Sequence, residues 1–218
     1  MTIVIAVDGT AASGKGTLAK RLAAHFGFAH LDSGSLYRLV ALRVLATKGD
    51  PKKEEDAVKA AKVIDPKRSS DPAIRTAEVG KVASVVSAYP AVRAALLEFQ
   101  RAFARTPPGA VIDGRDIGTV ICPQATAKLF VDAKPEIRAR RRWLELKSMG
   151  IARDEAELLA EIKARDAADM SRLISPLRPA PDAFLLDTSD MAIDAAFAAA
   201  LALVKPGVEN ALKARQGG

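Results

Sequence analysis

The residues with the clearest chemical meaning lie in a glycine-rich segment near the start of the chain. It consists of nine consecutive residues: Gly9, Thr10, Ala11, Ala12, Ser13, Gly14, Lys15, Gly16 and Thr17. An apolar run precedes it, and a buried strand that breaks into such a turn and opens a helix gathers backbone N–H groups at the positive end of a helix dipole. Lys15 adds a mobile positive charge for the outer phosphates of a nucleotide, and the Thr17 hydroxyl is within reach of a magnesium ion. The segment therefore predicts a phosphate-binding site with a place for Mg²⁺.

The surroundings of this segment fit that interpretation. Leu18, Leu22 and Phe26 are four residues apart, and Gly27 follows them. This pattern predicts an amphipathic helix directly after the loop. A chance glycine turn is the alternative, and the strand–turn–helix context favours phosphate binding over it.

Arginine and aspartate residues further along the chain have the arrangement that a phosphate acceptor needs. Phosphoryl transfer depends on two phosphates held in line with positive charge over the transferring group. Arg38 lies about one turn inside a predicted helix. Arg115 follows a predicted strand, where its planar guanidinium is suited to grip a phosphate with two bonds. Arg165, Asp169 and Arg172 are spaced four and three residues apart, so they line one face of a helix.

Asp116, next to Arg115, bears on the choice of the acceptor base. A carboxylate only accepts hydrogen bonds, and cytosine presents an exocyclic amine where uracil presents a carbonyl. Uracil would place two acceptors against each other, so Asp116 favours cytosine.

The elements that must position these residues alternate between short apolar runs and helical patterns. Five strands are predicted, at residues 3–8, 28–31, 110–113, 127–131 and 183–186. Polar segments that begin at Gly9, Asp32, Asp113 and Asp187 follow four of these strands. The alternation is typical of an α/β fold with a parallel sheet between helices, in which ligands gather at the carboxyl ends of the strands.

Helical patterns cover most of the remaining chain. Beyond the helix that follows Asp32, the expected ranges are 54–64, 74–88, 91–105, 135–147, 154–170 and 191–204. Residues 65–71 are polar and lie close to two prolines, so we expect a mobile loop there. The tail after Lys205 is polar, and we expect it to be disordered.

Composition narrows the class of protein. Of the 218 residues, 49% are hydrophobic and 27% are charged, as in a globular domain with a substantial core. The net charge of +7 favours polyanions or small phosphorylated ligands, but aromatic residues make up only 5%, which argues against base stacking on a nucleic acid. The single cysteine, Cys122, excludes an intrachain disulfide framework and fits the cytoplasm.

Neither a secretory signal nor a membrane anchor is expected. Residues 1–8 have no basic leader before their apolar run. The longest apolar stretch, 195–204, is shorter than the roughly 20 residues that span a bilayer.

Several longer strings resemble the bacterial cytidylate kinases. The GKGT form of the loop, with Gly16 between Lys15 and Thr17, is typical of nucleoside monophosphate kinases. The strings that carry the resemblance run in order: Leu31-Asp32-Ser33-Gly34-Ser35-Leu36-Tyr37-Arg38, Ile74-Arg75-Thr76, Arg93 after Pro90, Asp113-Gly114-Arg115-Asp116-Ile117-Gly118-Thr119-Val120, and Arg165-Asp166 with Asp169 and Arg172. The first and fourth of these strings are much more specific than the glycine-rich loop alone.

The resemblance implies a three-layer P-loop kinase fold with a five-stranded parallel sheet, ATP with Mg²⁺ as the phosphate donor, and CMP or dCMP as the acceptor. It implies that Arg38, Arg115 and Arg172 clamp the acceptor phosphate, that Ser84, Arg93 and Asp116 read the cytosine, and that Arg165 and Asp169 contact the sugar. The candidate catalytic residues are Lys15, Asp113, Arg115, Arg165 and Arg172; the candidate substrate-binding residues are Asp32, Ser33, Arg38, Ser84, Arg93, Arg115, Asp116, Arg165, Asp169 and Arg172; and the candidate metal ligands are Thr17 and Asp113.

The expected organisation is a single P-loop kinase domain across residues 1–218. Its parts are a core at about 1–49, 106–149 and 174–204, a helical acceptor-binding insert at about 50–105, an arginine-rich lid at about 150–173, and a tail at 205–218. The expected protein is a cytoplasmic monomer that binds small nucleotides and neither nucleic acid nor a membrane.

Some candidate residues have simpler alternatives. Asp113 resembles a carboxylate that orients a magnesium-bound water, but it also suits a strand end. Asp32 suits a helix cap, and Arg165 with Asp169 suits an exposed helix pair. Arginines in the range 138–142 look more like a solvated basic face than a site, and the alternative is that one of them reaches the phosphates of ATP.

The remaining histidines and the family pattern add further expectations. His25 and His30 are expected at the surface or behind the site.

The chain differs from the family pattern at two places. Residues 65–73 leave no room for the small antiparallel sheet that these kinases often carry in the acceptor-side insert, and Thr10 stands where they commonly have proline.

Two other functions stay open from the sequence. A monophosphate kinase with a preference for UMP or AMP would share most of these features. A basic nucleic-acid-binding protein that uses ATP as a conformational ligand would bind nucleic acid in a salt-sensitive way.

Overall fold

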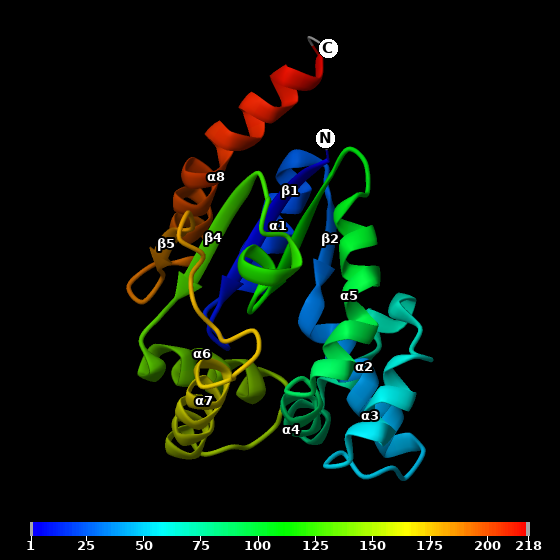
Figure 1. Ribbon diagram of the computed structural model, residues 1–218. Coiled ribbons are helices and arrows are strands. Elements are labelled where there is room, and N and C mark those ends of the chain that lie inside the picture. Colours follow the sequence, from blue (N-terminus) through cyan, green and yellow to red (C-terminus); the bar gives the residue numbers. More distant parts are fainter. Residues whose placement is uncertain (1, 217–218) are drawn as a thin grey trace. The chain divides into compact units, whose positions relative to one another are not determined.

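A computed structural model describes residues 2–216, and its contacts divide the chain into two compact units (Figure 1). The first unit comprises the chain up to His30 and from Ala104 onward, and the second comprises Leu31–Phe103. Most of the sheet and the glycine-rich loop belong to the first unit, whereas the second consists mainly of helices.

The sheet has five parallel strands in the order β2-β3-β1-β4-β5. Their bounds are β1 Ile3–Gly9, β2 Ala29–Asp32, β3 Gly109–Gly114, β4 Ala127–Asp132 and β5 Phe184–Asp187. In the middle of the sheet, Val7 of β1 is in register with Asp113 of β3 and Leu129 of β4. Every residue of β1 is buried, as expected for a continuous apolar run covered on both faces. The predicted α/β class and five strands are confirmed, each bound within one residue.

Two helices of the first unit, α1 (Lys15–Phe26) and α8 (Ile193–Gln216), share one apolar cluster with the sheet (Figure 1). Leu22 of α1 and Ala200 and Val204 of α8 are fully buried there, together with alternate residues of β1. This packing fixes the start of α1, and therefore the glycine-rich loop, against the central strand.

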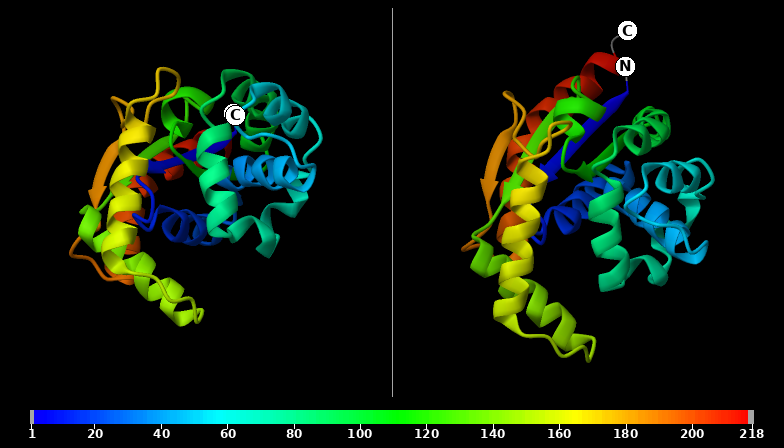
Figure 2. Two further views of the ribbon diagram at one scale, coloured as in Figure 1. Left: turned by 90° about the horizontal axis from the view of Figure 1, so that it is seen from below. Right: turned by 60° about the horizontal axis from the view of Figure 1, so that its bottom comes forward.

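Two further helices, α6 (Pro135–Ser148) and α7 (Glu155–Met170), pack side by side (Figure 2). The helix predicted at 135–147 is confirmed and ends at Ser148, and Gly150 just beyond it adopts a φ of 73° that favours glycine. Asp154 begins α7 as an N-cap and accepts a hydrogen bond from the Glu157 N–H at 2.9 Å.

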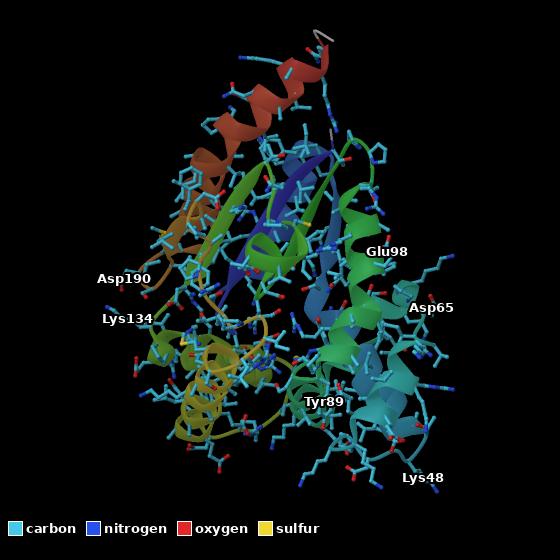
Figure 3. All side chains as sticks on the ribbon, in the orientation of Figure 1. Lys48, Asp65, Tyr89, Glu98, Lys134 and Asp190 are labelled. Carbon is cyan, nitrogen blue, oxygen red and sulfur yellow. The ribbon has the colours of Figure 1, made fainter. Side chains whose placement is uncertain are left out.

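The second unit is built around α2. Its elements are α2 Ser33–Ala46, α3 Glu54–Ala61, the 3₁₀ turns η1 Pro66–Ser70 and η2 Pro72–Arg75, α4 Ala77–Val86 and α5 Pro90–Ala104. Val40 and Val44 of α2 are fully buried, and α2 contacts α3 and α4. Tyr89, labelled in Figure 3, donates from its hydroxyl to the Pro51 carbonyl at 3.2 Å. This bond joins the loop between α4 and α5 to the loop between α2 and α3.

Several predicted boundaries were wrong. The expected mobile loop at 65–71 contains the short turn η1, and η2 follows directly after it, because Asp65 and Asp71 each precede a proline and cap a turn. The helix predicted at 74–88 begins only at Ala77, where the Thr76 side chain caps it.

The prediction of a disordered tail after Lys205 was also wrong. Helix α8 continues through Pro206 to Gln216. Val208 is fully buried and Leu212 packs against the same cluster, so apolar residues one turn apart hold the tail on the core.

By length and composition alone, α8 is also apolar enough to cross a membrane, with a mean hydropathy of 1.2 over its best window. Within the described residues no other single helix meets that test, although α4 and α5 meet it as one bent pair. Core helices of soluble proteins meet it as well, and the buried positions Ala200, Val204 and Val208 belong to the core of the first unit.

Candidate active site

The glycine-rich loop connects β1 to α1, as predicted. A Cβ built on Gly9 would lie 1.9 Å from the Val131 carbonyl oxygen, so only glycine fits where the chain leaves β1. Ala12 and Gly14 adopt positive φ values of 59° and 89°. Gly14 directly precedes Lys15, the first residue of α1. The loop thus turns into a helix N-terminus, the arrangement that receives phosphate oxygens.

Polar contacts fix the loop without using its backbone N–H groups. The Thr10 hydroxyl donates to Asp132 Oδ1 at 2.6 Å, and the Thr188 hydroxyl donates to the Ser13 carbonyl at 3.0 Å. The Lys15 ammonium donates to the Thr10 carbonyl at 3.2 Å and so folds back over the loop. Thr10 therefore links the loop to the end of β4 through a hydroxyl that proline lacks.

Arg138 of α6 is buried, which corrects the prediction of a solvated basic face at 138–142. It is 2% exposed and donates to the Ala11 carbonyl at 3.1 Å and the Ala133 carbonyl at 2.7 Å. Its guanidinium also pairs with Asp166 of α7 at 2.6 Å. A buried guanidinium needs such partners. Helical spacing could not separate this inward arginine from its neighbours, so the sequence analysis missed both members of the pair.

The ends of β4 and β5 are joined beside the loop. The Lys134 N–H donates to the Ser189 hydroxyl at 2.8 Å, and Ser189 in turn donates to Asp187. The hydroxyl of Ser189 and its backbone N–H, which donates to Asp187 Oδ1 at 2.8 Å, hold the pKa of Asp187 below its usual range. Lys134 and Asp190, both labelled in Figure 3, bring their charged groups to 4.0 Å.

Asp113, at the end of β3, lies beside the loop. Its Oδ2 is 3.6 Å from the position that a Cβ would take on Gly16, the neighbour of Thr17. His30 Nε2 lies 2.8 Å from the other carboxylate oxygen, behind Asp113 as the sequence suggested. A hydroxyl and a carboxylate fit Mg²⁺, which binds through few protein ligands together with phosphates and water. The described residues contain no group of three or more His, Cys, Asp or Glu side chains suited to hold a metal without a substrate.

Arg115, Asp169 and Arg172 form one ion-paired cluster. Arg115 Nε donates to Asp169 Oδ2 at 2.8 Å, and Arg172 Nη2 donates to Asp169 Oδ1 at 2.6 Å. Arg165 Nε lies 4.0 Å from the same carboxylate. Asp169 is only 2% exposed, so Arg165 and Asp169 are not the exposed pair that the alternative envisaged. Burial acts to raise the pKa of Asp169, but Arg115 and Arg172 outweigh it and hold the pKa below its usual range.

Asp116 is 5% exposed and directly precedes a short π-helical turn, η3 (Ile117–Ile121). Asp8 of β1 holds this turn, because its two carboxylate oxygens accept from the Ile117 N–H at 2.8 Å and the Gly118 N–H at 2.7 Å. The sequence analysis did not select Asp8. Its position at the carboxyl end of a strand, directly before Gly9, was the signal that could have found it.

The second unit holds further predicted acceptor residues. Arg38 of α2 donates to the Ile74 carbonyl at 2.8 Å, and a Cβ on Gly80 would lie 3.3 Å from its guanidinium. Ser84 of α4 donates to the Gly80 carbonyl at 3.3 Å. Arg38 and Ser84 therefore both adjoin Gly80, where the missing side chain leaves room for the guanidinium.

The remaining predicted residues of this unit are tied to backbone groups or rings. Arg93 is 9% exposed, donates to the Ser87 carbonyl at 3.1 Å and has its guanidinium carbon 5.5 Å from the centre of the Tyr37 ring. Asp32 caps α2 by accepting an N–H of its first turn at 3.2 Å, and Ser33 beside it is buried. Asp32 is therefore a helix cap, as the simpler interpretation of this residue expected.

The sheet has five parallel strands, and its central strand enters a glycine-rich loop with a lysine at a helix N-terminus. This arrangement defines a P-loop nucleotide-binding protein. Residues 5–206 match the cytidylate kinase family, and the chain belongs to that family.

The relatives of this chain agree with the family. It is 56% identical to the cytidylate kinase of Rhodopseudomonas palustris strain TIE-1 over 203 residues, which cover 93% of this chain and 96% of that protein. It is 54% identical to the cytidylate kinase of Bradyrhizobium diazoefficiens over the same shares of both proteins. A solved structure of an uncharacterized protein from Eubacterium ventriosum is 15% identical, with a TM-score of 0.51 over 94% of this chain and 99% of that one. That likeness concerns the fold alone.

Proposed function

We propose that the protein transfers the γ-phosphoryl group of ATP to CMP or dCMP in the presence of Mg²⁺ and releases ADP with CDP or dCDP. Membership of the cytidylate kinase family supports the choice of acceptor. The observation that carries the proposal is the convergence of Arg115 and Arg172 on one buried carboxylate, in the same unit as the glycine-rich loop. Transfer is in line and needs no covalent intermediate with the protein.

On the donor side, the N–H groups of the loop and Lys15 bind the phosphate oxygens of ATP. Lys15 exchanges its neutral partner, the Thr10 carbonyl, for an anionic oxygen, which makes the stronger hydrogen bond. Thr17 and Asp113 would hold Mg²⁺, directly or through water, while His30 orients the Asp113 carboxylate. When bound, Mg²⁺ neutralises negative charge on the β- and γ-phosphates.

On the acceptor side, Arg115 and Arg172 exchange Asp169 for oxygens of the acceptor phosphate. A guanidinium grips phosphate with two bonds, so the exchange keeps each arginine satisfied. Asp169, once released, accepts hydrogen bonds from hydroxyl groups of the sugar, and Arg165 donates to the oxygens of these groups.

The base is selected by Asp116. The Asp116 carboxylate accepts from the exocyclic amine of cytosine, and a uracil carbonyl in its place leaves two acceptors opposed. Replacing Asp116 by alanine removes this discrimination.

A steady-state assay with ATP, Mg²⁺ and a panel of CMP, dCMP, UMP and AMP tests the proposal. We expect kcat/KM for CMP and dCMP to exceed the values for UMP and AMP by about 10²-fold. Asp116→Ala should narrow the ratio of CMP to UMP, while the control Asp190→Ala, at an exposed position, should leave it unchanged. A preference for UMP or AMP would point to a different monophosphate kinase.

The same preparation tests the remaining alternatives. No turnover with any acceptor, combined with salt-sensitive binding to nucleic acid, would support a basic nucleic-acid-binding protein instead.

We further propose that the enzyme works as a cytoplasmic monomer. Light scattering at the assay concentration measures its mass and so tests whether it is a monomer.

A further inference from the structure

Asp8 joins the start of the glycine-rich loop to the turn that follows the predicted acceptor residues. It directly precedes Gly9, is 5% exposed, and accepts two adjacent backbone N–H groups, those of Ile117 and Gly118. A Cβ on Gly118 would lie 3.4 Å from Asp8 Oδ2 and 3.1 Å from the Lys128 side chain. The turn η3 is therefore closely packed on this carboxylate.

We propose that Asp8 is a positioning residue whose ionised side chain, through its two hydrogen bonds to η3, sets the placement of Arg115 and Asp116 and thereby acceptor binding and selectivity. The proposal rests on the function proposed above. Its chemical basis is that an ionised carboxylate accepts with both oxygens, whereas a carboxylic acid carries a hydroxyl that donates. The protonated side chain thus holds one of the two N–H groups and opposes the other.

The surroundings of Asp8 place this change near neutral pH. Burial raises the pKa of Asp8 to about 7; the hydrogen bonds from η3 lower it, Asp116 raises it and Lys15 lowers it. Lys128 of β4 packs against the same turn, but its ammonium pairs with Asp182 at 2.8 Å. Asp8 therefore changes between holding one N–H group and holding both in the range where the enzyme works.

The variant Asp8→Asn tests this, because asparagine keeps the shape but offers one acceptor and one donor, as the acid does. We expect kcat/KM of the wild type for CMP to rise through about pH 7, with an amplitude of about 10-fold for one lost hydrogen bond to a charged group. Asp8→Asn should lack this step, stay at the low-pH level of the wild type and show a smaller ratio of CMP to UMP. The acceptor phosphate itself titrates near pH 6, and the ratio of the two enzymes removes that contribution.

A matched control separates positioning from general destabilisation. Val7→Ala removes a fully buried side chain from the same strand without touching η3. It should lower the melting temperature, yet keep the pH step and the selectivity. Loss of the step in Val7→Ala as well would overturn the proposal.

Amide hydrogen exchange of residues 114–121, corrected for the intrinsic pH dependence, gives a readout that needs no activity. Protection at Ile117 and Gly118 should rise through about pH 7 in the wild type and stay flat in Asp8→Asn. Equal profiles in the two proteins would overturn the proposal even if CMP is phosphorylated. If the wild type does not phosphorylate CMP, the proposed function fails, while the exchange profile still decides whether Asp8 controls the turn.

Discussion

The glycine-rich loop and the Arg115–Asp169–Arg172 cluster, both in the first unit, are held in opposite ways. The loop is fixed by backbone geometry, since Gly9 leaves no space for a side chain against the Val131 carbonyl, and by hydrogen bonds to its own carbonyl groups. The cluster consists of long side chains gathered by ion pairs to one carboxylate. The glycine-rich loop thus has its shape without a ligand, whereas the arginines of the cluster are held by ion pairs that a ligand can replace.

This difference separates two ways of preparing a phosphate site. A preformed loop loses little conformational entropy on binding, so its affinity depends mainly on charge and on N–H groups already aimed at the ligand. In the cluster, Asp169 offsets the mutual repulsion of two guanidinium groups until phosphate arrives. In the proposed function, Asp169 gathers the two arginines before the acceptor arrives, and binding of the acceptor exchanges their partners.

The largest expected effect comes from removing the mobile charge of the preformed site. Lys15→Ala should lower kcat/KM for ATP by about 10³-fold, because no other group of the loop supplies that charge in the transition state. The melting temperature should hardly change, since Lys15 is not part of the apolar core. The control Lys20→Ala, at an exposed position on the same helix, should keep full activity in the same assay. A loss below about tenfold for Lys15→Ala would mean that the loop does not act on the transferring phosphate.

A smaller effect is expected when the charge that gathers the cluster is removed. Asp169→Asn should raise KM for CMP by about tenfold and leave KM for ATP nearly unchanged, because the glycine-rich loop does not depend on it. At neutral pH the free energy of unfolding should fall by about 3 kcal/mol, the typical cost of breaking a buried ion pair. Steady-state kinetics measure the two KM values, and urea unfolding measures the free energy of unfolding.

The same variant has a defined pH dependence. The pKa of Asp169 in the folded protein lies below the usual value of an aspartate, so its stabilising contribution is present above about pH 4 and is lost as the pH falls through the folded pKa. The wild type and Asp169→Asn should therefore approach equal stability in acid. The control Asp194→Asn breaks an exposed pair with Arg21 and should cost less than about 1 kcal/mol at any pH. An equal loss in both variants would contradict the view of Asp169 as the organising charge.

The same contrast explains how much the sequence could predict. The loop is contiguous, and the residue types of positions 9–17 report its geometry directly, so its place between β1 and α1 was predictable. The cluster joins Arg115 to a carboxylate 54 residues further along the chain, and only the family resemblance brought these residues together. Arg138 acts through backbone groups of distant segments, for which no local pattern exists. Asp8 also acts on a distant segment, and its place at the carboxyl end of a strand was its only signal in the sequence.

The end of the chain was mispredicted for a related reason. Local polarity after Lys205 suggested disorder, whereas Val208 and Leu212 pack on the core and keep α8 helical through Pro206. Tertiary packing outweighed local composition there.

The smallest expected effect tests how redundantly the preformed loop is held. Thr10→Val keeps the shape of the side chain but removes the hydrogen bond to Asp132, which should lower the free energy of unfolding by about 1 kcal/mol. Arg138 and Thr188 still donate hydrogen bonds to carbonyl groups of the loop. We therefore expect kcat/KM for ATP to fall less than about fivefold, which is less than the loss of one whole hydrogen bond would cause. Urea unfolding and ATP kinetics on the same preparation measure both. If activity instead falls as far as in Lys15→Ala while stability changes little, the loop is set by this one side chain, and the contrast between a backbone-built donor site and a side-chain-built acceptor site no longer holds.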